Sequence, residues 1–82
     1  MRLPRDLSGD ELIRALCRDW DYELVHQEGS HAVLQTQTPA HHRIAVPRHR
    51  NLRVGTVASI LRSVALHKGV TRDRLIESVI RE

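Results

Sequence analysis

The 82 residues of this chain suffice for one domain, and the hydrophobic fraction of 40% argues against a disordered chain. No apolar run approaches the roughly 18 residues that a membrane span requires, and no apolar block of a signal peptide follows the first residues. The single cysteine, Cys17, excludes an internal disulfide and a cysteine-based zinc finger. We therefore expect one domain over residues 1–82, located in the reducing cytoplasm.

The first predicted element is an amphipathic helix. Ser8 and Glu11 have the spacing of a capping box, so the helix should begin there and end near Trp20. Apolar residues recur along it at the spacing of one helical face: Leu12, Ile13, Leu16, Cys17 and Trp20. This face should be buried.

Three short strands are predicted next. The first lies over residues 22–27, with Tyr22 and Leu24 on one side of the strand. The second lies over residues 31–37 and the third over 43–46. Because only short turns separate them, the strands should pair as an antiparallel meander.

Two helices are predicted in the remaining sequence. The first should have Thr56 as its N-cap and end at Gly69, and Thr71 should cap the second. The order α-β-β-β-α-α predicts an α+β fold, in which helices cover one face of a three-stranded antiparallel sheet. Leu34 and Ile44 should lie on that covered face.

Charge is segregated along the chain. Between Gly29 and Arg72 there is no Asp or Glu, whereas seven residues are positive. The flanking segments are acidic, with net charges of −3 over residues 1–28 and −1 over residues 73–82. A positive centre with His31 directly after a Gly-Ser turn suggests a surface that holds phosphates beside an acid/base group.

These residue types suit the cleavage of RNA, which carries its own nucleophile in the 2′-OH beside each phosphodiester. His31 is the candidate general base or acid, because histidine changes charge near neutral pH. Glycine permits close approach of the backbone to a phosphate, and hydroxyl and guanidinium groups donate hydrogen bonds to it. The candidate phosphate-binding residues are Gly29, Ser30, Arg43, Arg48, His49, Arg50 and Arg53. His49 is also a candidate for a second proton-transfer group, and this chemistry requires no metal or other cofactor.

Several short motifs, in order and over nearly the whole chain, resemble the HicA toxins of type II toxin–antitoxin systems. They are Leu3-Pro4, Ser8-Gly9, Gly29-Ser30-His31, Val46-Pro47-x-His49, and Gly55-Thr56 followed by Ile60-Leu61-Arg62. The resemblance implies a fold like that of double-stranded-RNA-binding domains and a histidine-dependent endoribonuclease activity on mRNA. It also implies a HicB-type antitoxin as the protein partner. Glu28 departs from the family pattern, because such toxins often have a basic or neutral residue there.

Two other classes of function stay open on the sequence. One is a non-catalytic RNA- or DNA-binding module in which His31 only donates hydrogen bonds. The other is a protein-interaction domain whose basic face meets an acidic partner. His41 and His42 are interpreted as turn residues without a role, and Lys68 as part of a solvated helix face. The histidine spacings match no strong zinc signature.

Overall fold

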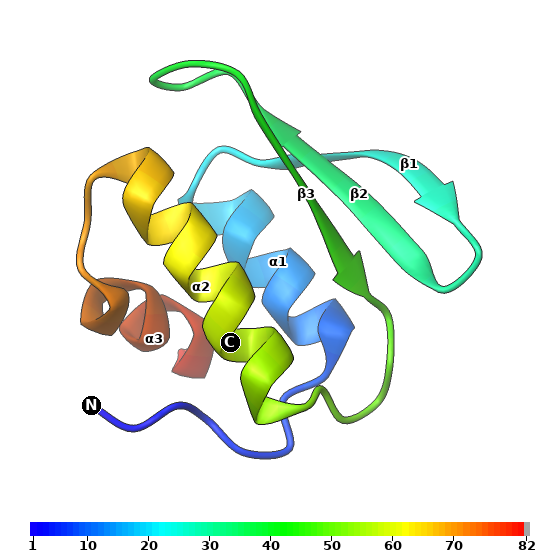
Figure 1. Ribbon diagram of the computed structural model, residues 1–82, viewed down its shortest axis with the longest axis vertical. Helices are drawn as coiled ribbons and strands as arrows, with labels where there is room; N and C mark the ends of the chain where they lie inside the picture. Colours follow the sequence, from blue (N-terminus) through cyan, green and yellow to red (C-terminus); the bar gives the residue numbers. More distant parts are fainter. Residues whose placement is uncertain (82) are drawn as a thin grey trace.

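The computed structural model describes residues 1–81 and shows six elements in the predicted order (Figure 1). They are α1 (Gly9–Asp19), β1 (Glu23–Glu28), β2 (His31–Thr36), β3 (His42–Pro47), α2 (Val54–Lys68) and α3 (Arg72–Ile80). The strands form one antiparallel sheet in the order β1-β2-β3, so β2 is the central strand. The predicted α+β fold is confirmed.

The helices lie on one side of the sheet. α1 and α2 pack against it, and α3 packs against both of them on the side away from the strands (Figure 1). Along β2 the side chains of Ala32, Leu34 and Thr36 are buried toward the helices, while the residues between them face the opposite side. Leu34 is completely buried and its register partner Ile44 is half-buried against the core, as predicted. No helix within residues 1–81 is long and apolar enough to cross a bilayer.

The helix ends follow the predicted capping rules with one exception. Ser8 and Glu11 form the capping box, Gly69 ends α2 in the left-handed conformation with φ 68°, and the Thr71 hydroxyl caps α3. The prediction of Thr56 as the N-cap of α2 is wrong, because this helix already begins at Val54. The backbone N–H of the buried Leu52 donates to the Leu7 carbonyl at 2.7 Å, which fixes the chain directly before the helix.

The edge strand β1 is more exposed than its sequence predicts. Tyr22, just before the strand, is buried, but Leu24 keeps 48% of its surface exposed and all six residues of β1 are exposed. The register with β2 shifts between Leu24 and His26, which is a β-bulge. In Figure 1 the β1–β2 hairpin extends beyond the helices, so most of β1 has no helix to cover it. The sequence pattern carries apolar residues here, but the core does not reach them.

Candidate functional site

The Gly29-Ser30 turn presents His31 at one end of the sheet. Glu28 and His31 are register partners, so the turn between them has two residues. Gly29 has a φ of 59°, as the first position of a type II′ hairpin turn requires. Because Ala32 points into the core, the side chain of His31 lies on the opposite face, where it is exposed. The predicted catalytic candidate is therefore accessible to a large substrate.

A second imidazole lies beside the first. The ring centroids of His31 and His49 are 6.5 Å apart, with an angle of 65° between the rings. Nε2 of His49 is also 3.5 Å from the hydroxyl oxygen of Ser30. Three residues predicted separately for the site, from the turn and from the loop after β3, thus converge on one point of the surface. Two neighbouring imidazoles can supply both an acid and a base.

Two backbone hydrogen bonds, one to the β1–β2 turn and one from α1, fix the loop that carries His49. The backbone N–H of Arg48 donates to the carbonyl of Ser30 at 2.7 Å, and the N–H of Gly9 donates to the carbonyl of His49 at 2.9 Å. The helix α1 starts so close to this loop that a Cβ on Gly9 would overlap the carbonyl oxygen of Pro47. The N-terminus of α1 therefore holds the loop against the His31 turn.

The guanidinium of Arg48 is occupied within the protein. Its Nε donates to Oδ1 of Asp10 at 2.7 Å, and an Nη donates to Oε1 of Gln27 at 3.1 Å. Arg48 thereby joins α1, β1 and the loop after β3. A phosphate therefore has to compete with the carboxylate of Asp10 for the guanidinium of Arg48. The sequence predicted Arg48 as a phosphate ligand and did not predict this ion pair.

The other predicted arginines are exposed and come from two different parts of the fold. Arg50 and Arg53 belong to the segment between β3 and α2 that also carries His49. Arg43 lies on the same face of the sheet as His31, but at its opposite end, about 13 Å away along the strand at 3.3 Å per residue. The structure therefore places Arg50 and Arg53 on the same segment as His49 and separates Arg43 from His31 along the sheet.

A carboxylate lies next to the histidine pair. Glu28 is directly opposite His31 in the β1–β2 register, and its Oε2 is 3.7 Å from Nε2 of His26. The side chains of Glu28 and His26 lie on the same face of the sheet as His31, the open face that the helices do not cover. This follows from the register, because Glu28 is the partner of His31 and His26 is the partner of Val33. This carboxylate can hold a protonated imidazole, and it also repels a phosphate that approaches the same face.

A second histidine cluster lies at the other end of the sheet, and sequence reasoning missed it. His42 is a strand residue, and its Nδ1 and Nε2 lie 2.8 Å from the Tyr22 hydroxyl and 3.1 Å from the Ser63 hydroxyl. Its ring stacks on His67 at 4.4 Å. The interpretation of His42 as a turn residue is thus wrong. The alternation of β3 could have shown this, since His42 shares the helix-facing side with Ile44.

Lys68 belongs to the same cluster and is not part of a solvated helix face. Its Nζ donates to the hydroxyls of Thr36 and Thr38 and to the Thr38 carbonyl, and it lies 5.0 Å from the centroid of the Tyr22 ring. Burial lowers the pKa of Lys68, and burial raises the pKa of Tyr22 to about 12. The cluster joins the C-terminal end of α2 to the strand ends, which is a structural role.

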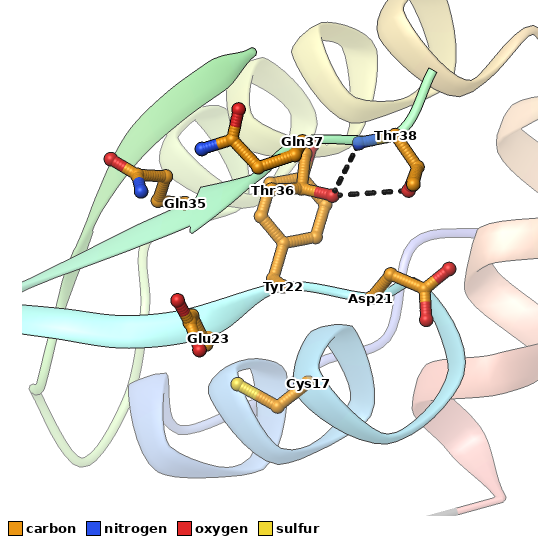
Figure 2. A pocket seen from close by; sticks show the side chains of 8 residues that line it. All are labelled: Cys17, Asp21, Tyr22, Glu23, Gln35, Thr36, Gln37 and Thr38. Carbon is orange, nitrogen blue, oxygen red and sulfur yellow. Dashed lines mark hydrogen bonds between the residues drawn. The ribbon is translucent and has the colours of Figure 1, made fainter. Parts of the chain in front are cut away.

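An open pocket of about 500 Å³ lies beside this second cluster (Figure 2). It is lined by Cys17, Asp21, Tyr22, Glu23, Gln35, Thr36, Gln37 and Thr38. Burial raises the pKa of the Cys17 thiol, so it lacks the thiolate character of a reactive cysteine. None of the predicted site residues lines this pocket, because it lies at the Gln35–Thr36 end of β2 and His31 is at the other end of that strand. Within residues 1–81, no three His, Cys, Asp or Glu side chains are grouped to hold a metal ion.

Comparison with models of known protein families gives a match to most of the chain. A family model described as the HicA toxin of bacterial toxin–antitoxin systems matches residues 9–66. The matched range includes the histidine pair, the turn, the loop after β3 and most of α2. No curated protein and no solved structure matches the chain.

Proposed function

The chain belongs to the family of HicA toxins of bacterial toxin–antitoxin systems, and from this premise we propose that it is an endoribonuclease that cleaves mRNA by histidine acid/base catalysis. The proposal includes the cytoplasm as the site of action, where mRNA is found. It also includes a fold related to double-stranded-RNA-binding domains, so that the RNA is recognised by its backbone and shape. The chain has only one Trp and one Tyr, and Tyr22 is buried, so stacking on bases contributes little.

The pairing of His31 with His49 is the observation that carries this proposal. Cleavage of RNA needs one group that takes the proton of the 2′-OH and another that gives a proton to the leaving 5′-oxygen. The ring centroids of His31 and His49 are 6.5 Å apart on an exposed surface, so ring nitrogens of both residues can contact one phosphodiester bound against them. His31 is one of the two proton-transfer residues, and His49 is the second.

The bonds formed and broken and the protons transferred in this reaction balance without a cofactor. The 2′-oxygen attacks phosphorus while one imidazole takes its proton, and the bond from phosphorus to the 5′-oxygen breaks as the other imidazole supplies a proton. The products are a 2′,3′-cyclic phosphate and a free 5′-hydroxyl. Charge that develops on the phosphoryl oxygens is stabilised by hydrogen bonds from the protein.

The proposed phosphate ligands divide into two groups. Arg50 and Arg53, on the loop that carries His49, bind the reacting phosphate or its neighbour, together with the Gly29 backbone and the Ser30 hydroxyl. Arg43 lies farther along the open face and binds a more distant phosphate. Arg48, in contrast, holds the loop in place through Asp10 and Gln27.

Regulation by an antitoxin follows from the family. We propose a HicB-type partner that covers His31 and the loop over residues 48–53, and thereby excludes RNA both sterically and by its own negative charge. A saturating amount of the antitoxin should abolish cleavage, and unchanged cleavage by the complex contradicts this part of the proposal.

The activity is tested with purified wild-type protein and the His31→Ala variant, each incubated with RNA in EDTA. Wild-type protein should cleave the RNA and leave cyclic phosphate ends, while His31→Ala should bind RNA but not cleave it. RNA with a single 2′-deoxy substitution at the cleaved position should resist cleavage. Binding without cleavage by the wild type supports the non-catalytic module instead. Absence of both RNA binding and cleavage supports the protein-interaction domain.

A further inference from the structure

Three arginines surround a second surface pocket that is distinct from the histidine pair. The pocket measures about 360 Å³ and is lined by Arg2, Leu3, Arg5, Val54 and Arg72. The arginines come from the N-terminal segment and from the first residue of α3, and Val54 is the first residue of α2. In Figure 1 the N-terminal segment, in dark blue, passes below the start of α2 toward α3. The fold thus brings together positive residues from the two ends of the chain.

The segment that carries these arginines is held in place by the core. Leu3 packs partly buried against the core, Leu7 is buried, and the carbonyl of Leu7 accepts the N–H of Leu52 at 2.7 Å. An Nη of Arg72 is 3.5 Å from the carbonyl oxygen of Met1. The three arginines therefore line the pocket from backbone that contacts with the core and with Met1 hold in place.

The charge in this pocket is not balanced by its lining. No Asp or Glu among residues 1–81 lines it, and the nearby Asp73 pairs with the N-terminal ammonium at 3.4 Å. All three arginines are exposed to solvent. Guanidinium groups around an open pocket of this kind match the geometry of phosphate oxygens.

The pocket adjoins the loop that leaves the histidine pair. Val54 in its wall directly follows Arg53, and the five residues 49–53 span at most about 17 Å even when fully extended. A nucleic acid strand bound at the histidines can follow Arg50 and Arg53 and reach the pocket within a few nucleotides. All three arginines lie outside residues 9–66, so the family match assigns them no role.

From this arrangement we propose that Arg2, Arg5 and Arg72 form a second phosphate-binding subsite, which holds the RNA backbone beyond the cleaved bond. The inference rests on the proposed ribonuclease function and extends the bound length of RNA. The subsite binds phosphate without reading bases, so it contributes affinity for long RNA and no sequence preference.

Binding of RNA tests the subsite. The ligand is a 2′-O-methyl RNA, which has the backbone charge but lacks the nucleophile, and binding is followed by fluorescence anisotropy over a range of salt concentrations. Arg5→Ala and Arg72→Ala should each weaken binding about two- to fivefold, the range for exposed ion pairs. Each should also reduce the slope of log affinity against log salt by about 0.7, the value for one phosphate of a single strand. Arg74→Ala, an exposed arginine on the same helix but outside this pocket, is the matched control.

The outcomes separate this inference from the ribonuclease proposal. Suppose that Arg5→Ala and Arg72→Ala bind RNA like the Arg74→Ala control while wild-type protein cleaves RNA. The proposal of a second phosphate-binding subsite is then wrong, and the proposal of ribonuclease activity is kept. Wild-type protein that neither binds nor cleaves RNA overturns both. If the variants bind RNA normally but no longer bind the antitoxin, the pocket recognises an acidic protein surface instead. Circular dichroism of each variant verifies that the fold is unchanged.

Discussion

The Nε atom of Arg48 lies 2.7 Å from the carboxylate of Asp10, although the two residues are 38 positions apart in the sequence. The pair joins the N-terminus of α1 to the loop that carries His49, and the Arg48 backbone joins the same loop to Ser30. Both side chains are about half exposed, so the ion pair contributes little to stability, about 0–1 kcal/mol. Its effect is on geometry, because it orients the loop beside His31.

Asp10→Asn tests whether Arg48 positions the loop or binds phosphate. With the ion pair weakened, a positioning role predicts cleavage slower by about tenfold to a hundredfold, since a displaced acid/base group loses its alignment, with little change in RNA affinity. A phosphate-binding role predicts the opposite, tighter RNA binding by the released guanidinium. Cleavage rates and anisotropy on the same RNA distinguish them.

The dependence of cleavage on pH tests the role of His49. If His31 and His49 divide the two proton transfers, the rate for the wild type follows a bell-shaped curve, because one imidazole must be neutral and the other protonated. His49→Ala should slow cleavage by about 10²–10⁴-fold and remove one limb of the curve. A curve that keeps both limbs in His49→Ala shows that His49 only binds the phosphate.

Two glycine substitutions test the close packing of α1 on the loop that carries His49. Gly9→Ala places a methyl group against the carbonyl of Pro47, so it should destabilise the fold by about 1–3 kcal/mol. Gly55→Ala is the control: it lies in the first turn of α2 with open space around it, and should be neutral or stabilising by up to about 1 kcal/mol. Urea unfolding measures both. Equal stability of the two variants contradicts the close packing of Gly9 against the carbonyl of Pro47.

The second histidine cluster predicts that stability falls in mild acid. Burial lowers the pKa of His42 from its ordinary value of 6.5, and the positive charges of His67, Lys68 and His41 lower it further. The unfolded chain therefore binds this proton more readily than the folded one. The stability that the neutral ring provides is complete above the unfolded pKa of 6.5 and is lost as the pH falls through the lower folded pKa.

This prediction is measured by urea unfolding between neutral pH and about pH 5.5, above the range in which most carboxylates titrate. The free energy of unfolding should decrease with falling pH in the wild type, and slightly less in His41→Asn, because that variant removes the smallest of the charges that lower the pKa of His42. The decrease should be smaller in His42→Gln. If the free energy of unfolding changes with pH by the same amount in all three proteins, His42 is not the cause of the change.

A pair of core substitutions tests the covered face of the sheet. Leu34→Ala should cost about 2–5 kcal/mol, because the side chain is completely buried on the central strand. Its register partner Ile44 is only half-buried, so Ile44→Ala should cost less. His31→Ala, an exposed position, should keep the stability of the wild type. A large loss of stability in His31→Ala supports a purely structural role for this histidine.

The sequence by itself determined the local features of this protein. The structure confirms three of them: the capping box of Ser8 and Glu11, the end of α2 at Gly69 and the turn at Gly29. Each depends only on residues that are close together in the sequence. The alternation of apolar residues in β2 and β3 likewise indicated the covered face, because strand residues alternate between two environments. The order of these elements is enough to specify the α+β class.

Only the tertiary structure decided which distant side chains meet. The ion pair of Arg48 with Asp10 and the contacts of His42 with Tyr22 and Ser63 join residues about 20 to 40 positions apart, and no local pattern encodes such pairs. The arginine pocket brings Arg2 and Arg5, from an N-terminal segment of net negative charge, together with Arg72 at the end of the positive centre. Sequence spacing fixes the face on which a residue lies, whereas packing of whole elements fixes its neighbours across the fold.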